Sequence, residues 1–217
     1  MHYVTLRKAE FWLADGSFKI SPKDVYQIYT LMGSCGAGPN QRILPFAIIL
    51  MTGKSQIEYS AAFDTLDKMS LRYAPISEEW SLRPNLVIVD FEQAAANAFQ
   101  IAWPAVKIRH CYFHLSQSVV KRTRSLFASG FAFNQDFHTH IRSLYCLSFF
   151  APEKIEHAYN VLKNKMTEKF GDQFPNLNKL WTYFEMNYIG NDARFTHQCL
   201  GIRVLYNDIL GNSFLGK

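Results

Sequence analysis

The sequence predicts an α/β protein in which a mixed five-stranded sheet is followed by a helical extension. Three observations lead to this prediction. The apolar residues change from strand-like to helix-like spacing near Ser55, strand-like and helix-like segments then alternate as far as Phe127, and only helix-like segments follow. With 217 residues, of which 48% are hydrophobic and 19% charged, the chain is long and apolar enough to fold around a core.

Three strand-like segments come first. Residues 10–20 are rich in aromatic and β-favouring side chains, residues 24–34 carry alternating apolar side chains, and residues 43–53 form a nearly continuous apolar run. The connections "SPKD" and "SCGAGPN" are short and carry turn-forming residues. These features predict an antiparallel meander.

The spacing then alternates between helix and strand. Residues 55–74 predict a helix that begins with a capping box formed by Ser55 and Glu58. A buried strand at residues 86–89, an alanine-rich helix at 91–103, a short strand at 106–114 and a basic amphipathic helix at 115–127 follow in that order. Three further helices are predicted within residues 134–150, 152–166 and 174–190.

Two aspartates carry the candidate chemistry. Asp15 lies within the first strand, and Asp90 directly follows the fourth. Each has a structural explanation: Asp15 as an outward-facing strand residue beside Gly16, and Asp90 as a helix cap that pairs with Gln93 and stabilises by about 1 kcal/mol. The order of elements, however, is that of an RNase H-like sheet with strand order 3-2-1-4-5, where the first and fourth strands are neighbours. Two carboxylates that meet there repel each other, and a divalent cation relieves the repulsion.

Four blocks of the chain resemble successive blocks of the transposase domain of Mutator-like elements, over residues 11–124. The blocks are "LADGSFKISPKDVYQIYTL", "LPFAIILMTGKSQIEYSAAFDTL", "LVIVDFEQAAANAFQIAWP" and "IRHCYFHLSQSVVKR". The resemblance implies an Asp-Asp-Glu nuclease core in which Asp15 and Asp90 are the catalytic, metal-binding residues. It also implies Mg²⁺ or Mn²⁺ as cofactor and DNA as the partner that is cleaved and transferred. The predicted domains are a transposase core at 10–127, a helical insertion or extension at 128–190 and a divergent tail at 191–217.

Two further groups of residues accompany the aspartates. Cys111 and His114 form a C-x-x-H pair, which is too few ligands for a zinc site and is expected to play a structural role or to lie near the metal site. Lys121, Arg122 and Arg124 lie on the basic helix and are expected to contact DNA phosphates, although a solvated helix face explains them equally well.

The third carboxylate of the triad has no counterpart of the expected type. The family carries a T-N-N-x-x-E motif after the helical insertion, and this sequence has none; Glu185 and Asp208 are the conceivable substitutes. The sequence therefore resembles a truncated or degenerate copy whose cleavage activity is uncertain. The alternatives are a domesticated, non-catalytic module that binds nucleic acid or protein and, more weakly, an unrelated metal-free α/β binding domain.

Composition adds little to the choice among these functions. The net charge of +5 is compatible with nucleic acid but common in proteins that never bind it. The chain has no apolar run of about eighteen residues, so a membrane span is not expected. Four scattered cysteines predict a reducing setting, in the nucleus or the cytoplasm. The composition is also compatible with a homo-oligomer.

Overall fold

The computed structural model describes residues 3–36, 40–72, 82–189, 193 and 195. It contains two compact units, residues 1–109 and 110–217. The divergent tail predicted at 191–217, which includes Asp208, lies almost entirely outside the described residues. The domain limits expected from the sequence stay a prediction, and one helix (α4, Tyr112–Phe133) runs continuously through the expected limit at residue 127.

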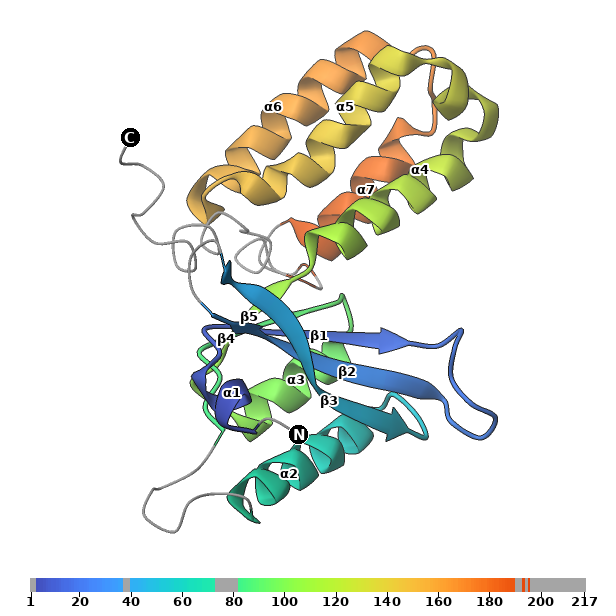
Figure 1. The fold of residues 1–217 in the computed structure, drawn as a ribbon. Coiled ribbons are helices and arrows are strands. Elements are labelled where there is room, and N and C mark those ends of the chain that lie inside the picture. Colours follow the sequence, from blue (N-terminus) through green and yellow to red (C-terminus); the bar gives the residue numbers. More distant parts are fainter. Residues whose placement is uncertain (1–2, 37–39, 73–81, 190–192, 194, 196–217) are drawn as a thin grey trace. The chain divides into compact units, whose positions relative to one another are not determined.

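The first unit is built on a five-stranded sheet with the order β3-β2-β1-β4-β5, which confirms the predicted order (Figure 1). Strand β1 pairs antiparallel with β2 and parallel with β4, and β2 pairs antiparallel with β3. The sheet is therefore mixed, and β1 lies at its centre. Its strands are β1 (Trp12–Ser17), β2 (Gln27–Cys35), β3 (Arg42–Met51), β4 (Leu86–Val89) and β5 (Lys107–His110).

Three helices belong to the same unit: α1 (Tyr3–Lys8), α2 (Gln56–Arg72) and α3 (Gln93–Ala102). Helices α2 and α3 lie on one face of the sheet (Figure 1). The sequence predicted α2 and α3 but gave no signal for the short α1. The core beneath the sheet is strongly aromatic, with rings that touch one another in a continuous set: Trp12, Tyr29, Tyr59, Phe63, Phe99 and Trp103.

The start of α2 confirms the predicted capping box. The backbone N–H of Ser55 donates to Glu58 Oε2 at 2.8 Å, and the N–H of Glu58 donates to Ser55 Oγ at 3.4 Å. The buried stripe of this helix runs through Tyr59, Phe63, Leu66 and Ser70, whereas Ile57 is 81% exposed.

The second unit is helical, as predicted. After α4 it contains α5 (Gln135–Cys146), the short 3₁₀ helix η2 (Leu147–Phe149), α6 (Pro152–Phe170) and α7 (Leu177–Tyr188). Phe137, on α5, is fully buried and stacks on Phe174 with a centroid distance of 4.1 Å, and it meets Phe127 and Phe170 edge to face. These four rings form the centre of the packing between α4, α5 and α6.

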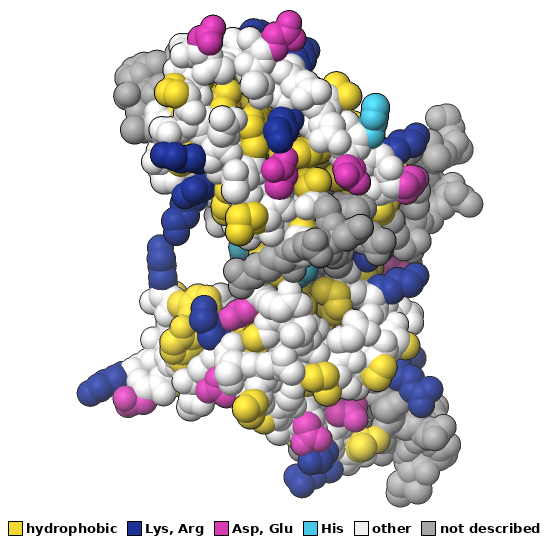
Figure 2. All heavy atoms as spheres, turned by 180° about the vertical axis from the view of Figure 1, so that it is seen from behind, with side chains coloured by type: hydrophobic (Ala, Val, Ile, Leu, Met, Phe, Trp, Pro, Cys, Tyr) yellow, Lys and Arg dark blue, Asp and Glu magenta, His cyan; other side chains and the backbone are white. Residues whose placement is uncertain are grey.

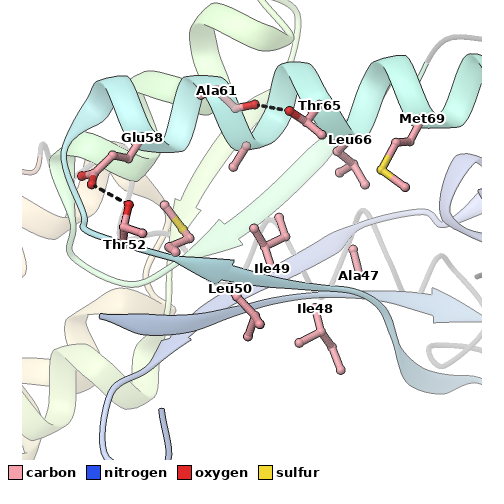
Figure 3. Close-up of a pocket in the computed structure, with 12 residues that line it drawn as sticks. Ala47, Ile48, Ile49, Leu50, Thr52, Glu58, Ala61, Thr65, Leu66 and Met69 are labelled. Carbon is pink, nitrogen blue, oxygen red and sulfur yellow. Dashed lines mark hydrogen bonds between the residues drawn. The ribbon is translucent and has the colours of Figure 1, made fainter. Parts of the chain in front are cut away.

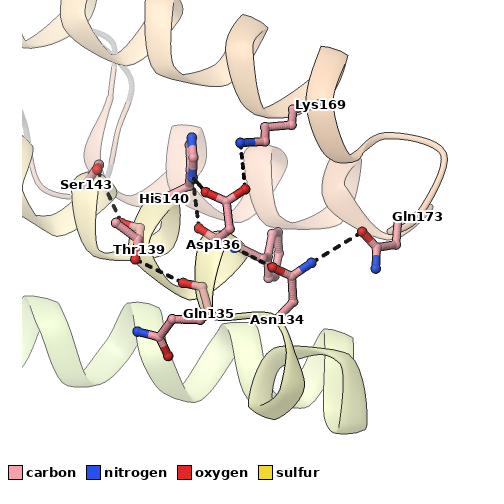
Figure 4. A network of polar contacts seen from close by, with 9 residues as sticks. Asn134, Gln135, Asp136, Thr139, His140, Ser143, Lys169 and Gln173 are labelled. Carbon is pink, nitrogen blue, oxygen red and sulfur yellow. Dashed lines mark hydrogen bonds and ion pairs between the residues drawn. The ribbon is translucent and has the colours of Figure 1, made fainter.

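A polar network fixes the start of α5 against α6 (Figure 4). Asn134 caps the helix by accepting from the N–H of Phe137 at 2.8 Å. In the first turn of α5, Asp136 pairs with Lys169 of α6 at 2.6 Å and with His140 at 3.3 Å. The successive helices α5 and α6 are thus joined at the surface as well as in the core.

Candidate metal centre

The two candidate aspartates emerge on the same face of the sheet. In the parallel β1–β4 pair, Trp12 lies opposite Val87 and Leu13 opposite Ile88. Side chains alternate between the two faces of a strand, so when this register is continued by two residues Asp15 lies opposite Asp90. Burial follows the same alternation. Trp12 and Ala14 are buried in β1, as are Val87 and Val89 in β4, whereas the residues between them are only partly buried: Leu13, Asp15, Ile88 and Asp90.

The electrostatic environment of Tyr29, a buried residue of β2, includes several acidic groups. Burial is the main cause that raises the pKa of the Tyr29 hydroxyl well above its ordinary value. The negative charges of Asp90, Glu92 and Asp15 raise that pKa further. Three carboxylates therefore act on one buried hydroxyl. In the described residues no set of three His, Cys, Asp or Glu side chains is close enough to share a metal ion.

Asp90 is not the cap of the following helix, as one reading of the sequence predicted. Helix α3 begins at Gln93, and its N-cap residue is Glu92. Gln93 does not complete a capping box either, because its side chain donates to Asn97 at 2.8 Å. The chain leaves β4, turns through Asp90 and Phe91, and enters the helix two residues later than predicted.

Glu92, which sequence reasoning did not single out, is held by two side chains of other elements. The Tyr59 hydroxyl of α2 donates to Glu92 Oε2 at 2.9 Å, and Lys54 Nζ lies 3.7 Å from Glu92 Oε1. Burial raises the pKa of the Tyr59 hydroxyl and the charge of Glu92 adds to the rise, so the hydroxyl remains a donor at neutral pH. The Glu92 side chain makes no capping hydrogen bond to α3.

The contacts continue to the first strand through Gln27, a buried polar residue at the start of β2. Its side-chain N–H group donates to the Tyr59 hydroxyl at 2.9 Å and to the carbonyl of Gly53 at 3.2 Å. The residue after Asp15 is Gly16, and a Cβ atom there would collide with the Gln27 carboxamide oxygen. A glycine at this position lets β1 pass directly over Gln27.

The cleft between β3 and α2 is a different place and has a different character. It has a volume of about 560 Å³ and a mostly apolar lining that includes Ile49, Leu50 and Leu66 (Figure 3). Its one carboxylate, Glu58, is engaged in the capping box and with Thr52. Neither Asp15 nor Asp90 lines this cleft, so it is not the centre of the predicted chemistry.

The remaining candidate residues lie in the second unit, at the start of α4 and along it. Cys111 is the N-cap residue of α4, since β5 ends at His110 rather than at the predicted residue 114. Burial alone would raise the pKa of the Cys111 thiol, but hydrogen bonds from the His114 side chain and from backbone N–H groups outweigh it and lower the pKa. Cys111 and His114 are thus in contact with each other.

The basic residues of α4 differ in exposure. Lys121 and Arg124 are exposed, whereas Arg122 is half-buried and lies over the Tyr183 ring, 5.4 Å from its centroid. Figure 2 shows Lys and Arg side chains gathered along one side of the helical unit. Glu185, a conceivable third carboxylate, accepts from Tyr159 at 3.0 Å and from Lys163 at 2.7 Å.

The strand order and the pair of acids on neighbouring central strands define the class of this protein: an α/β domain consistent with the RNase H-like fold. Comparison with family models is more specific, because residues 11–118 match the MULE transposase domain. The chain belongs to this family through a MULE-type transposase domain that holds both Asp15 and Asp90. Among curated proteins the comparison finds no match. None of the helices in the described part of the chain combines the length and the apolar character that crossing a membrane requires.

Proposed function

We propose that the first unit is the nuclease core of a transposase and that Asp15 and Asp90 together hold one divalent cation, Mg²⁺ or Mn²⁺. The proposal rests on the register of β1 and β4, in which Leu13 lies opposite Ile88; when it is continued by two residues, Asp15 lies opposite Asp90 on the same face. The donor set fits the ion, since Mg²⁺ prefers oxygen ligands and takes one or two carboxylates while keeping water. When bound, the cation would polarise a phosphodiester oxygen of DNA.

The surroundings of the two carboxylates favour a preorganised site. Leu13 and Ile88, which precede them by two residues on the same face, are partly buried and apolar. An apolar floor lowers the local dielectric and strengthens the attraction between a cation and its ligands. The roles of Asp15 and Asp90 are to bind the ion and to orient it toward the phosphate.

The partner implied by a transposase domain is DNA. We propose that Lys121 and Arg124 of α4 contact its phosphates, because both are exposed cations one turn apart on the same helix. Arg122 contributes less freely, because it also packs over Tyr183. Contacts of this kind supply affinity without sequence preference, and each neutralised phosphate adds roughly 0.9 to the slope of affinity against salt.

The proposed metal centre is tested by titration calorimetry with Mn²⁺. Asp15→Asn and Asp90→Asn should each lower the affinity about tenfold, which is about 1.4 kcal/mol. Asp136→Asn is the matched control, because this aspartate lies in the second unit and its carboxylate is already paired with Lys169 and His140. Equal Mn²⁺ binding by the wild type and by both aspartate variants would refute the centre.

DNA cleavage and DNA binding are separated by two further assays. The sequence has no T-N-N-x-x-E segment to support a second ion, so plasmid nicking with Mg²⁺ or Mn²⁺ should be weak, while DNA binding persists. The double variant Lys121→Gln/Arg124→Gln should weaken DNA binding and reduce its salt dependence, unlike the charge-matched control Lys154→Gln/Lys165→Gln. Robust nicking that disappears in Asp90→Asn would show that another carboxylate completes the site, and DNA binding without any nicking would favour the domesticated module.

A further inference from the structure

Two side chains of the first unit stand next to the two aspartates without being candidates for metal ligands themselves. Gln27 lies directly under Gly16, the residue that follows Asp15. Glu92 lies two residues after Asp90, at the end of the turn that leads from β4 into α3. Both side chains are bonded to the same atom, the hydroxyl oxygen of Tyr59, at 2.9 Å each.

The Tyr59 hydroxyl is a rigid link between them. Its residue is fully buried in the aromatic core, where the ring meets Tyr29 with a centroid distance of 4.9 Å and Phe63 with one of 6.1 Å. The oxygen accepts the Gln27 N–H and donates its own hydrogen to Glu92. A hydrogen-bonded chain of this kind has one direction only, so each member orients the next.

We propose that Gln27, Tyr59 and Glu92 form a positioning network that sets the separation of the Asp15 and Asp90 carboxylates and thereby controls the affinity of the metal centre. This inference rests on the proposed function, since it concerns the same centre. Through Gln27 the network contacts strand β1, which carries Asp15. Through Glu92 it holds the turn that carries Asp90. Groups that orient metal ligands in this way typically change metal affinity about 10- to 100-fold when they are removed.

The contact between Lys54 and Glu92 indicates that Glu92 positions the metal ligands and does not itself bind the metal. Its ammonium group lies 3.7 Å from Glu92 Oε1 and offsets the charge of this carboxylate, while Tyr59 occupies Oε2. Both oxygens of Glu92 therefore already have partners that belong to the fold. A carboxylate held in this manner can anchor a turn, and its hydrogen bond matters more than its charge.

The experiment measures the Mn²⁺ dissociation constant of the full chain by calorimetry, with the electron paramagnetic resonance of bound Mn²⁺ as a second readout. Tyr59→Phe removes the shared hydroxyl and should weaken Mn²⁺ binding about tenfold or more. Tyr159→Phe is the matched control, because Tyr159 is equally buried and donates to Glu185 beside Lys163 in the second unit. It should cost similar stability and leave the Mn²⁺ affinity unchanged.

A second pair of variants keeps the test decisive if Tyr59→Phe does not fold. Glu92→Ala removes the acceptor and should weaken Mn²⁺ binding about as much as Tyr59→Phe, whereas Glu92→Gln keeps an oxygen that accepts from Tyr59 and should bind nearly as the wild type does. If Glu92→Gln loses as much affinity as Asp90→Asn, Glu92 is itself a ligand and the inference is wrong. If Glu92→Ala and Tyr59→Phe both bind as the wild type does, the network is only structural. Failure of the Asp15→Asn and Asp90→Asn variants to weaken binding would instead overturn the proposed centre.

Discussion

Truncation of Phe137 to alanine should strip the helical unit of most of its stability. The side chain is fully buried and packs against three other rings, Phe127, Phe170 and Phe174, at centroid distances of 4.1–5.3 Å. A buried Phe→Ala change costs about 3–5 kcal/mol, and each aromatic pair adds about 0.5–1.5 kcal/mol beyond burial, so the upper end of the range applies. Domains are stable by only about 5–15 kcal/mol in total.

For a unit of about 100 residues this loss lowers the melting temperature by roughly 15–30 °C. The measurement is thermal unfolding followed by circular dichroism, with hydrogen exchange to locate the change. Amides of α5, α6 and α7 should lose protection, whereas those of β1, β2 and β3 should keep it. Phe150→Ala is the control, since Phe150 belongs to the same unit but is 45% exposed. If Phe137→Ala and Phe150→Ala melt at the same temperature, the aromatic cluster does not hold the unit together.

Two further outcomes follow from single contacts. The hydrogen bond from the backbone N–H of Ser55 lowers the pKa of the Glu58 carboxylate. The ionised carboxylate therefore stabilises α2 at pH values above its usual pKa, and this stabilisation is lost as the pH falls through the lowered pKa. Glu58→Gln should destabilise the protein at neutral pH but not in acid, which denaturant unfolding at both pH values would show. At neutral pH the thiol of Cys111 should be alkylated faster than that of Cys146, because His114 favours the thiolate form of Cys111. His114→Ala should therefore slow the alkylation of Cys111, as measured by mass spectrometry. An unchanged alkylation rate in this variant would contradict the expectation.

Much of the sheet could be predicted because its strands carry strong local signals. The apolar run of β3, the alternation in β2 and the change to helical spacing at Ser55 are each visible over about ten residues, and the capping box of α2 needs only Ser55 and Glu58. The order of the strands followed from the order of element types. Helix α1 has only six residues and no such signal, and its existence depends on contacts with β2 and β3.

The candidate centre could be predicted only in part, because several of its contacts join residues that lie far apart in the sequence. Asp15 and Asp90 stood out through their positions within and after strands. The bond between Tyr59 and Glu92 joins residues 33 positions apart, and the bond between Gln27 and Tyr59 joins residues 32 apart. No local pattern encodes such a pairing. The N-cap residue is likewise Glu92 rather than Asp90, although the Glu92 side chain makes no capping hydrogen bond and accepts from Tyr59 instead.

The alternation of β1 also has an evolutionary consequence. Trp12 and Ala14 face the core, and Asp15 faces the other side. Insertion or deletion of a single residue between Trp12 and Asp15 would exchange the faces of the residues on one side of it, so that either Asp15 turns into the core or Trp12 turns out of it. Such a lineage would lose the carboxylate or part of the core in one event. The connection between β1 and β2 lies outside the ladder and can change in length without this exchange. Copies of this domain that have drifted in length but still fold are therefore expected to keep residue 15 on the metal-facing side, whether or not it is still an aspartate.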